Sequence, residues 1–416
     1  MTARPIAGPM SPVVRRILLG NTLSAIGSGM TVPLLIVYLG QVRGLGTGIA
    51  GLVIAYMALV SLLLMPATGV LVDRFGPRPI LIAGLLTEAM GVALLTQVDS
   101  AGTAFAVATV VSLGASFTWS PQSALLGRLA TAEERQRVFG IQFMLLNLGI
   151  GIGGIVAALV VDVTSTSTFT ILYLVDALTY LLYVGVLLTL RGVGVGRAPV
   201  EADAPQDAGY RDVLRDRVLL RVAILALVLL TCGYGSLEVG MPVIITVVNG
   251  LPVAWVAIAF TVNTGTIVVM QLGVLRLIRG RSRSRLMALV AVLWALSWVI
   301  LGASGILPPV LAIVAICLST LVFAVGETLW APIMPAIVND LAPEHLRGRY
   351  NSVQSLVWGI SGALGPGLAG LLLGAGLVAV WIPLVVIGCL GAGLLALGLR
   401  SHLTPALDGR AGDAGP

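Results

Sequence analysis

Long apolar segments separated by short charged ones make up most of the chain. A helix needs about 20 apolar residues to cross the hydrocarbon core of a bilayer, and the pattern predicts twelve such helices. Their expected ranges are 17–40, 47–71, 79–98, 101–126, 138–161, 168–190, 219–248, 252–275, 285–304, 308–338, 350–376 and 377–399. The first lacks a convincing signal-peptide cleavage site, so we expect it to be retained as a helix.

The positions of the arginines predict how the chain is oriented in the membrane. The chain contains 24 basic residues, and all of them are arginine. If the amino terminus lies in the cytoplasm, every arginine except Arg43 falls in a cytoplasmic segment, which is the positive-inside pattern. We therefore expect a multi-pass protein of the cell (inner) membrane with both termini in the cytoplasm.

Composition excludes several classes of protein. Hydrophobic residues make up 58% of the chain and charged residues 10%, whereas a soluble domain carries about 25% charged residues. The net charge of +6 is spread over short loops and needs no nucleic-acid partner to explain it. Cys232, Cys317 and Cys389 lie inside apolar segments without the spacing of metal ligands. We expect no metal site and no cofactor.

The longest polar segment divides the expected helices into two sets of six. The sequence thus predicts a six-helix bundle over 1–190, a cytoplasmic linker over 191–218, a second bundle over 219–400 and a cytoplasmic tail over 401–416. The halves resemble each other, because Arg135-x-Arg137 recurs as Arg347-x-Arg349 at the equivalent loop. Such repeats are typical of transporters with a site near the membrane midplane. The expected fold class is an all-α integral membrane protein with two pseudo-twofold-related bundles.

A motif lies between the second and third expected helices, at residues 69–78, with the sequence G-V-L-V-D-R-F-G-P-R. It resembles the loop signature G-x-L-x-D-R-x-G-R-R/K of the major facilitator superfamily. The matching positions are Gly69, Leu71, Asp73, Arg74, Gly76 and Arg78. The family usually has a basic residue where this chain has Pro77. The equivalent loop of the second half, 273–281, keeps both glycines but contains no acid.

The resemblance implies two bundles that open alternately to the two sides of the membrane, as in the 12-span drug, macrolide and siderophore exporters of this family. Glycine permits tight turns and close helix approach, and a carboxylate is favoured at a helix amino terminus. We expect Asp73 to contact such a terminus and an arginine of the other bundle. This gating contact would form in one state and break in the other.

Four acids lie within the expected helices, namely Glu238, Glu327, Asp176 and Glu88. Carboxylates at membrane depth are costly and usually functional, so these residues are candidates for coupling a proton to substrate. Glu238 ranks high because Gly235 and Pro242 predict a broken helix around it, and Glu327 ranks with it. Asp176 opens a D-A-L-T-Y stretch that resembles one in macrolide and siderophore exporters. The alternative for each acid is a protonated carboxyl that only joins two helices.

Polar and aromatic residues within the expected helices suggest a cavity for a large apolar substrate. The candidates are Asn21, Met30, Asn147, Tyr234, Asn263, Trp330 and Trp358. The alternative for each is packing in the core or at the membrane interface.

These features favour a proton-coupled exporter of amphiphilic or cationic small molecules, whose partners are the substrate, protons and the lipid bilayer, and which acts as a monomer. A lipid or lysophospholipid translocator of the same fold is the alternative. Nutrient uptake fits less well, because the helices offer no arginine for an anionic substrate. Another class would be an intramembrane enzyme or the membrane subunit of a larger complex. The sequence has no HExxH, G-x-S-x-G or Walker A motif, so we expect no enzyme activity.

Overall fold

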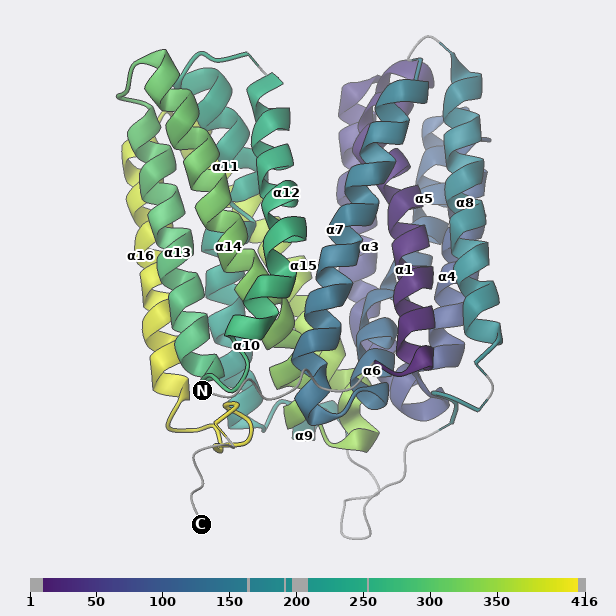
Figure 1. Ribbon diagram of the computed structural model, residues 1–416. Helices are drawn as coiled ribbons and strands as arrows, with labels where there is room; N and C mark the ends of the chain where they lie inside the picture. Colours follow the sequence, from purple (N-terminus) through teal and green to yellow (C-terminus); the bar gives the residue numbers. More distant parts are fainter. Residues whose placement is uncertain (1–9, 163–164, 191, 197–208, 253, 411–416) are drawn as a thin grey trace. The chain divides into compact units, whose positions relative to one another are not determined.

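The structure is a computed structural model that describes residues 10–162, 165–190, 192–196, 209–252 and 254–410, without the side chains of Thr47 and Glu238. Within these residues, twelve helices are long and apolar enough to cross a membrane (Figure 1). This confirms the number of spans predicted from the apolar segments. The chain is a multi-pass, all-α membrane protein.

The chain divides into two compact units. The first comprises Met1–Gln206 together with Ala342–Ser352, and the second comprises Asp207–Leu341 together with Val353–Pro416. The sequence analysis placed residues 342–352 in the second bundle. In the structure this segment groups with the first unit, where Asp73 binds its backbone.

Six spans form the first unit. Its helices are α1 (Pro12–Thr31), η1 (Val32–Leu34), α2 (Leu35–Val37), η2 (Tyr38–Val42), α3 (Gly46–Phe75), α4 (Pro77–Leu95), α5 (Ala101–Ser116), α6 (Trp119–Leu129), α7 (Ala132–Val160) and α8 (Thr166–Leu188). The short helix η5 (Glu344–Leu346) and the start of α15 (Arg347–Gly374) also belong to it.

The second unit holds the remaining spans. Its helices are α9 (Tyr210–Val213), α10 (Arg217–Leu229), η3 (Leu230–Tyr234), α11 (Leu237–Val243), η4 (Ile244–Val248), α12 (Ala254–Leu277), α13 (Arg283–Ser304), α14 (Pro309–Leu341), the rest of α15, and α16 (Val378–Leu399). The bounds agree with the expected ranges to within a few residues for most spans.

Proline and glycine account for the interruptions within spans. The fourth span was expected to be continuous, but it breaks between α5 and α6. Pro121 has no N–H to donate to the carbonyl of Phe117, so the regular hydrogen-bond pattern fails there. The seventh span passes through the π-helical turn η3 next to Gly235, which confirms the break predicted at this place.

The same pairs of helices pack together in both units. In the first, α4 packs on α5 and α8; in the second, the equivalent α13 packs on α14 and α16. Equivalent glycines also lie at close crossings. A Cβ on Gly153 would come within 2.1 Å of the Ile26 carbonyl, and one on Gly365 within 2.5 Å of the Gly235 backbone. The internal repeat seen in the sequence is therefore a repeat of packing.

Candidate coupling and gating sites

Asp73 lies in the last turn of α3 and binds the start of α15. Its Oδ1 accepts a hydrogen bond from the Gly348 N–H at 2.6 Å. Its Oδ2 accepts from the backbone N–H of Arg349 at 3.3 Å and pairs with the Arg349 guanidinium at 3.0 Å. A charged acceptor at a helix amino terminus is favoured by the exposed N–H groups and the helix dipole. Because α15 continues into the second unit, this contact holds the end of a helix that both units share.

The approach of α15 to α3 is close enough to require glycine. A Cβ on Gly348 would lie 2.6 Å from the carbonyl oxygen of Gly69 and from the Asp73 carboxylate. Ser352, one turn further along α15, donates a hydrogen bond to the carbonyl of Met65. The start of α15 is therefore held by a line of backbone and side-chain contacts along the last turns of α3.

The loop after Asp73 is held by a segment that follows the sixth span. The Arg78 N–H donates to the Gly194 carbonyl at 3.0 Å, and the Gly196 N–H donates to the Phe75 carbonyl at 3.0 Å. Gly76 has φ +89°, and a Cβ there would lie 2.6 Å from the Gly194 oxygen. Only glycine combines this backbone conformation with this close approach.

Two other loop residues differ in exposure. Arg78 is buried, and its Nη2 donates to the carbonyl of Leu188 at 3.3 Å. Arg74 is exposed and lies over the ring of Phe75, with 5.3 Å between Cζ and the ring centroid. Arg78 therefore supports the loop from inside, whereas Arg74 remains available to solvent or headgroups.

Glu88 and Asp176 of the first unit each accept hydrogen bonds from hydroxyl groups. Thr118 Oγ1 donates to Glu88 Oε2 at 2.9 Å, and the Tyr180 hydroxyl donates to Oε1 at 3.0 Å. Tyr180 also hydrogen-bonds Ser28 at 2.9 Å. The Glu88 carboxyl on α4 therefore contacts α8 and the turn before α6, and Tyr180 extends these contacts to α1.

Asp176 joins the same helices on the side of α1. Thr31 Oγ1 donates to Asp176 Oδ2 at 2.5 Å. Asp176 and Tyr180 are four residues apart on α8, so both side chains lie on one face. Gly27 lets α1 approach this face, because a Cβ there would lie 2.3 Å from both Asp176 Oδ1 and Thr179 Oγ1.

Glu327 lies on α14 in the second unit and is 3% exposed. Its Oε2 accepts a hydrogen bond from Asn263 Nδ2 at 2.5 Å. Phe323 and Trp330 lie on the same face of α14, four residues before and three residues after Glu327. Both rings pack on Trp294, with centroid separations of 4.8 Å and 5.8 Å. The structure thus brings together two candidates, Glu327 and Asn263, beside an aromatic cluster.

The aromatic cluster extends to two more cavity candidates. Tyr234 packs edge-on against Trp358 at 5.1 Å and lies 6.2 Å from Trp294. Trp330 and Trp358 line a small apolar cavity with Met334 of α14 and residues of α10. Trp294 fits here because Gly233 and Gly326 leave room for its ring.

Among the described contacts, Met30, Asn147 and Asn21 have none with these sites. In the first unit, Met30 packs against Ala157 and Leu172, and Asn147 donates to the carbonyl of Phe143 in its own helix. Asn21 is buried in α1. The backbone of Glu238 belongs to α11, and its side chain lies outside the described residues.

Sequence reasoning missed several partners of the candidate acids. Tyr180 lies four residues after Asp176, and Phe323 and Trp330 lie four residues before and three residues after Glu327. These spacings match the helical period, so the sequence could have placed each set on one helix face. No such spacing identifies Thr118 as a partner of Glu88, because its position depends on the break in the fourth span.

Residues 17–366 match the Major Facilitator Superfamily. The chain belongs to this superfamily. Its members are membrane transporters, and this chain is a transporter.

Similar proteins agree with this assignment. The uncharacterized MFS-type transporter YqjV of Bacillus subtilis (strain 168) is 24% identical over 346 residues, which cover 82% of this chain and 81% of YqjV. The multidrug resistance protein MdtH of Cronobacter sakazakii is 26% identical over 388 residues, 91% of each chain.

Solved structures show the same fold. A bacterial homologue of the iron transporter ferroportin, in its outward-facing state, gives a TM-score of 0.78 at 14% identity over 94% of this chain and 100% of that chain. The transporter FucP in its outward conformation gives 0.76 at 13% identity over 93% and 98%. At these identities the likeness concerns the fold alone.

Proposed function

We propose that this transporter exports amphiphilic, cationic small molecules in exchange for protons, by alternating access, as a monomer in the cell inner membrane with both termini in the cytoplasm. The observation that carries the proposal is the position of Glu327, a buried carboxyl on the face of α14 that also carries Phe323 and Trp330. Exchange requires a group that binds either a proton or the substrate, and a carboxyl can do both.

The surroundings of Glu327 favour an organic cation. Aromatic faces attract cations through their quadrupole, and the attraction grows when water is excluded. Phe323 and Trp330 lie about one helical turn before and after Glu327 on α14, and both rings pack on Trp294. Asn263 donates to one carboxylate oxygen and orients it. A proton at Glu327 would cancel the charge that attracts the substrate, so proton and cation would bind in competition.

The acids of the first unit support coupling at a second place. Glu88 accepts hydrogen bonds from the hydroxyls of Thr118 and Tyr180, and Asp176 accepts one from the hydroxyl of Thr31. Hydroxyls can donate to a carboxylate and can also accept from a protonated carboxyl. The hydrogen bonds around each acid would therefore form whether its carboxyl is protonated or not.

The contact of Asp73 with α15 supplies a gate for alternating access. It joins a carboxylate to two backbone N–H groups and one arginine. Such a group of contacts has discrete formed and broken states, as a two-state transporter requires. The name of the relative MdtH, a multidrug resistance protein, agrees with export.

The test is transport by the purified chain in proteoliposomes with an imposed pH gradient. We expect gradient-driven flux of aromatic organic cations, lost in Glu327→Gln. The matched control is Glu133→Gln, an exposed acid of α7, which should transport as the wild type does. Wild-type flux that survives collapse of the gradient would overturn proton coupling and favour the lipid translocator. Full activity of Glu327→Gln would remove Glu327 from the mechanism.

A further inference from the structure

The segment after the last helix folds back on the loop between α12 and α13. Its central residue, Asp408, is 0% exposed. Ser282 Oγ donates to Asp408 Oδ2 at 2.7 Å, and the Ser284 N–H donates to Oδ1 at 2.8 Å. Arg410 pairs with the same carboxylate at 2.7 Å. The acid thus lies at the amino terminus of α13, where negative charge is favoured.

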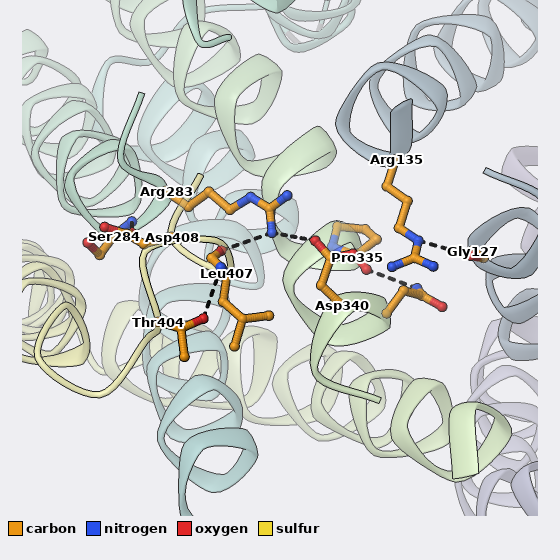
Figure 2. Close-up of polar contacts among 10 residues, drawn as sticks. Gly127, Arg135, Arg283, Ser284, Pro335, Asp340, Thr404, Leu407 and Asp408 are labelled. Atoms are coloured by element: carbon orange, nitrogen blue, oxygen red, sulfur yellow. Dashed lines mark hydrogen bonds and ion pairs between the residues drawn. The ribbon is translucent and has the colours of Figure 1, made fainter. Parts of the chain in front are cut away.

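Arg283 joins this segment to the end of α14, as Figure 2 shows. Its Nη1 donates to Asp340 Oδ2 at 2.6 Å and to the Leu407 carbonyl at 3.0 Å. Its backbone N–H donates to the Asp408 carbonyl at 2.8 Å. Arg283 is 4% exposed, so these contacts are shielded from water and salt.

The end of α14 is followed directly by the segment that Asp73 binds. Asp340 lies in the last turn of α14, and the chain then enters Ala342–Ser352, the segment that Asp73 holds. One end of this segment is therefore fixed by Asp73 in the first unit. Arg283 fixes the point in the second unit from which the segment departs.

The first unit contains an equivalent arrangement. There, residues 192–196 follow the sixth span and bind the loop at Phe75 and Arg78 through backbone hydrogen bonds. In the second unit, residues 403–410 follow the twelfth span and bind the equivalent loop at Arg283. The difference lies in the acid. The first loop carries its own acid, Asp73, which binds the start of α15, whereas the loop 273–282 has none and is bound at its end by Asp408 of the tail.

We propose that residues 403–410 are a working part of the cytoplasmic gate, in which Asp408 is a positioning residue for Arg283 and thereby fixes the end of α14. The inference rests on the proposed alternating access. When Asp73 and Gly348 separate, the segment Ala342–Ser352 pulls on Asp340. While Arg283 binds Asp340, only the segment Ala342–Ser352 moves. When this contact is lost, the last turn of α14 can unfold as well.

The experiment uses the full chain with its three cysteines replaced by serine and a reporter at Ala342→Cys. An impermeant maleimide is applied to the cytoplasmic side of inside-out vesicles. Loss of a charged helix cap changes a local opening equilibrium about fivefold, so Asp408→Asn should raise the labelling rate by that factor. Asp340→Asn should do the same. The matched control, Asp413→Asn, changes an acid further along the same tail and should leave the rate unchanged.

A double variant distinguishes two roles for Asp408, namely positioning Arg283 and only capping α13. If Asp408 acts through Arg283 on Asp340, then Asp408→Asn combined with Asp340→Asn should label no faster than either single variant. Additive effects, or wild-type labelling in Asp408→Asn, overturn the proposal. Should Asp408→Asn fail to fold, Ser282→Ala removes one donor and should give a smaller increase, and wild-type labelling there overturns the proposal equally. Absence of gradient-driven flux in the wild type would refute the proposed function, and the labelling rates would still test the tail.

Discussion

Tyr180 donates a hydrogen bond to Glu88 at 3.0 Å, across the packing of α8 against α4. Neither residue has a charged partner among the described contacts of this network. The carboxyl of Glu88 instead accepts hydrogen bonds from the hydroxyls of Tyr180 and Thr118, and Tyr180 in turn bonds Ser28. The position of this carboxyl therefore depends on neutral donors.

Tyr180→Phe should reduce proton-driven transport several-fold while the protein still folds. The variant keeps the ring but removes the donor, and one lost buried hydrogen bond costs about 1 kcal/mol. Flux in proteoliposomes and thermal unfolding in detergent would be measured together. Tyr56→Phe is the control, because the Tyr56 hydroxyl bonds the exposed Thr109. A normal flux in Tyr180→Phe would show that the hydroxyl network has no part in coupling.

Asp73→Asn should open the gate. The amide still has an oxygen to accept from Gly348, but it loses the charge pair with Arg349. Cytoplasmic maleimide labelling of a Ser352→Cys reporter should rise several-fold, because Ser352 contacts α3 beside this pair. Arg74→Gln changes an exposed charge of the same loop and should not affect labelling. Equal labelling in both variants would contradict the gating role of Asp73.

Gly76→Ala should lower the unfolding free energy by about 1–3 kcal/mol, since φ +89° with ψ 156° is a conformation available essentially to glycine alone. The methyl group would also meet the Gly194 carbonyl. Thermal unfolding in detergent measures the effect. Gly154→Ala in α7 is the control, because a Cβ there meets no atom within 4 Å. An unchanged melting temperature for Gly76→Ala would mean that the loop rearranges at little cost.

Trp330→Leu should raise KM for aromatic cations about fivefold and leave transport of neutral aliphatic compounds unchanged, because a buried cation–π contact contributes about 1 kcal/mol. Competition for dye efflux measures both classes. The control is Trp119→Leu, which changes an exposed tryptophan of α6. A similar rise for both classes of compound would point to packing, with no cation recognition at this ring.

The sequence predicted the spans well, because the length of an apolar segment directly reflects the thickness of the bilayer. The break beside Gly235 was also predictable, since it follows from local backbone preferences. The break before Pro121 shows the limit, because the long apolar segment concealed it.

Partners distant in the chain could not be predicted in the same way. Asp408 lies in a short polar tail that resembles any solvated end, and only the folded chain brings it to α13. Likewise, Asn263 and Glu327 were both candidates, but no spacing relates residues on different helices. The roles of these residues, and of Glu238, stay predictions.

Trp294 packs against Phe323, Tyr234 and Trp330. Intrinsic tryptophan fluorescence can therefore report on this cluster. Of its 7 tryptophans, only Trp119 lies in the first unit, and the others lie in the second. Ultraviolet emission of the unlabelled protein therefore comes mostly from the second unit, which holds Glu327. Titrating substrate or acid while recording that emission would follow events at this carboxyl without any attached dye.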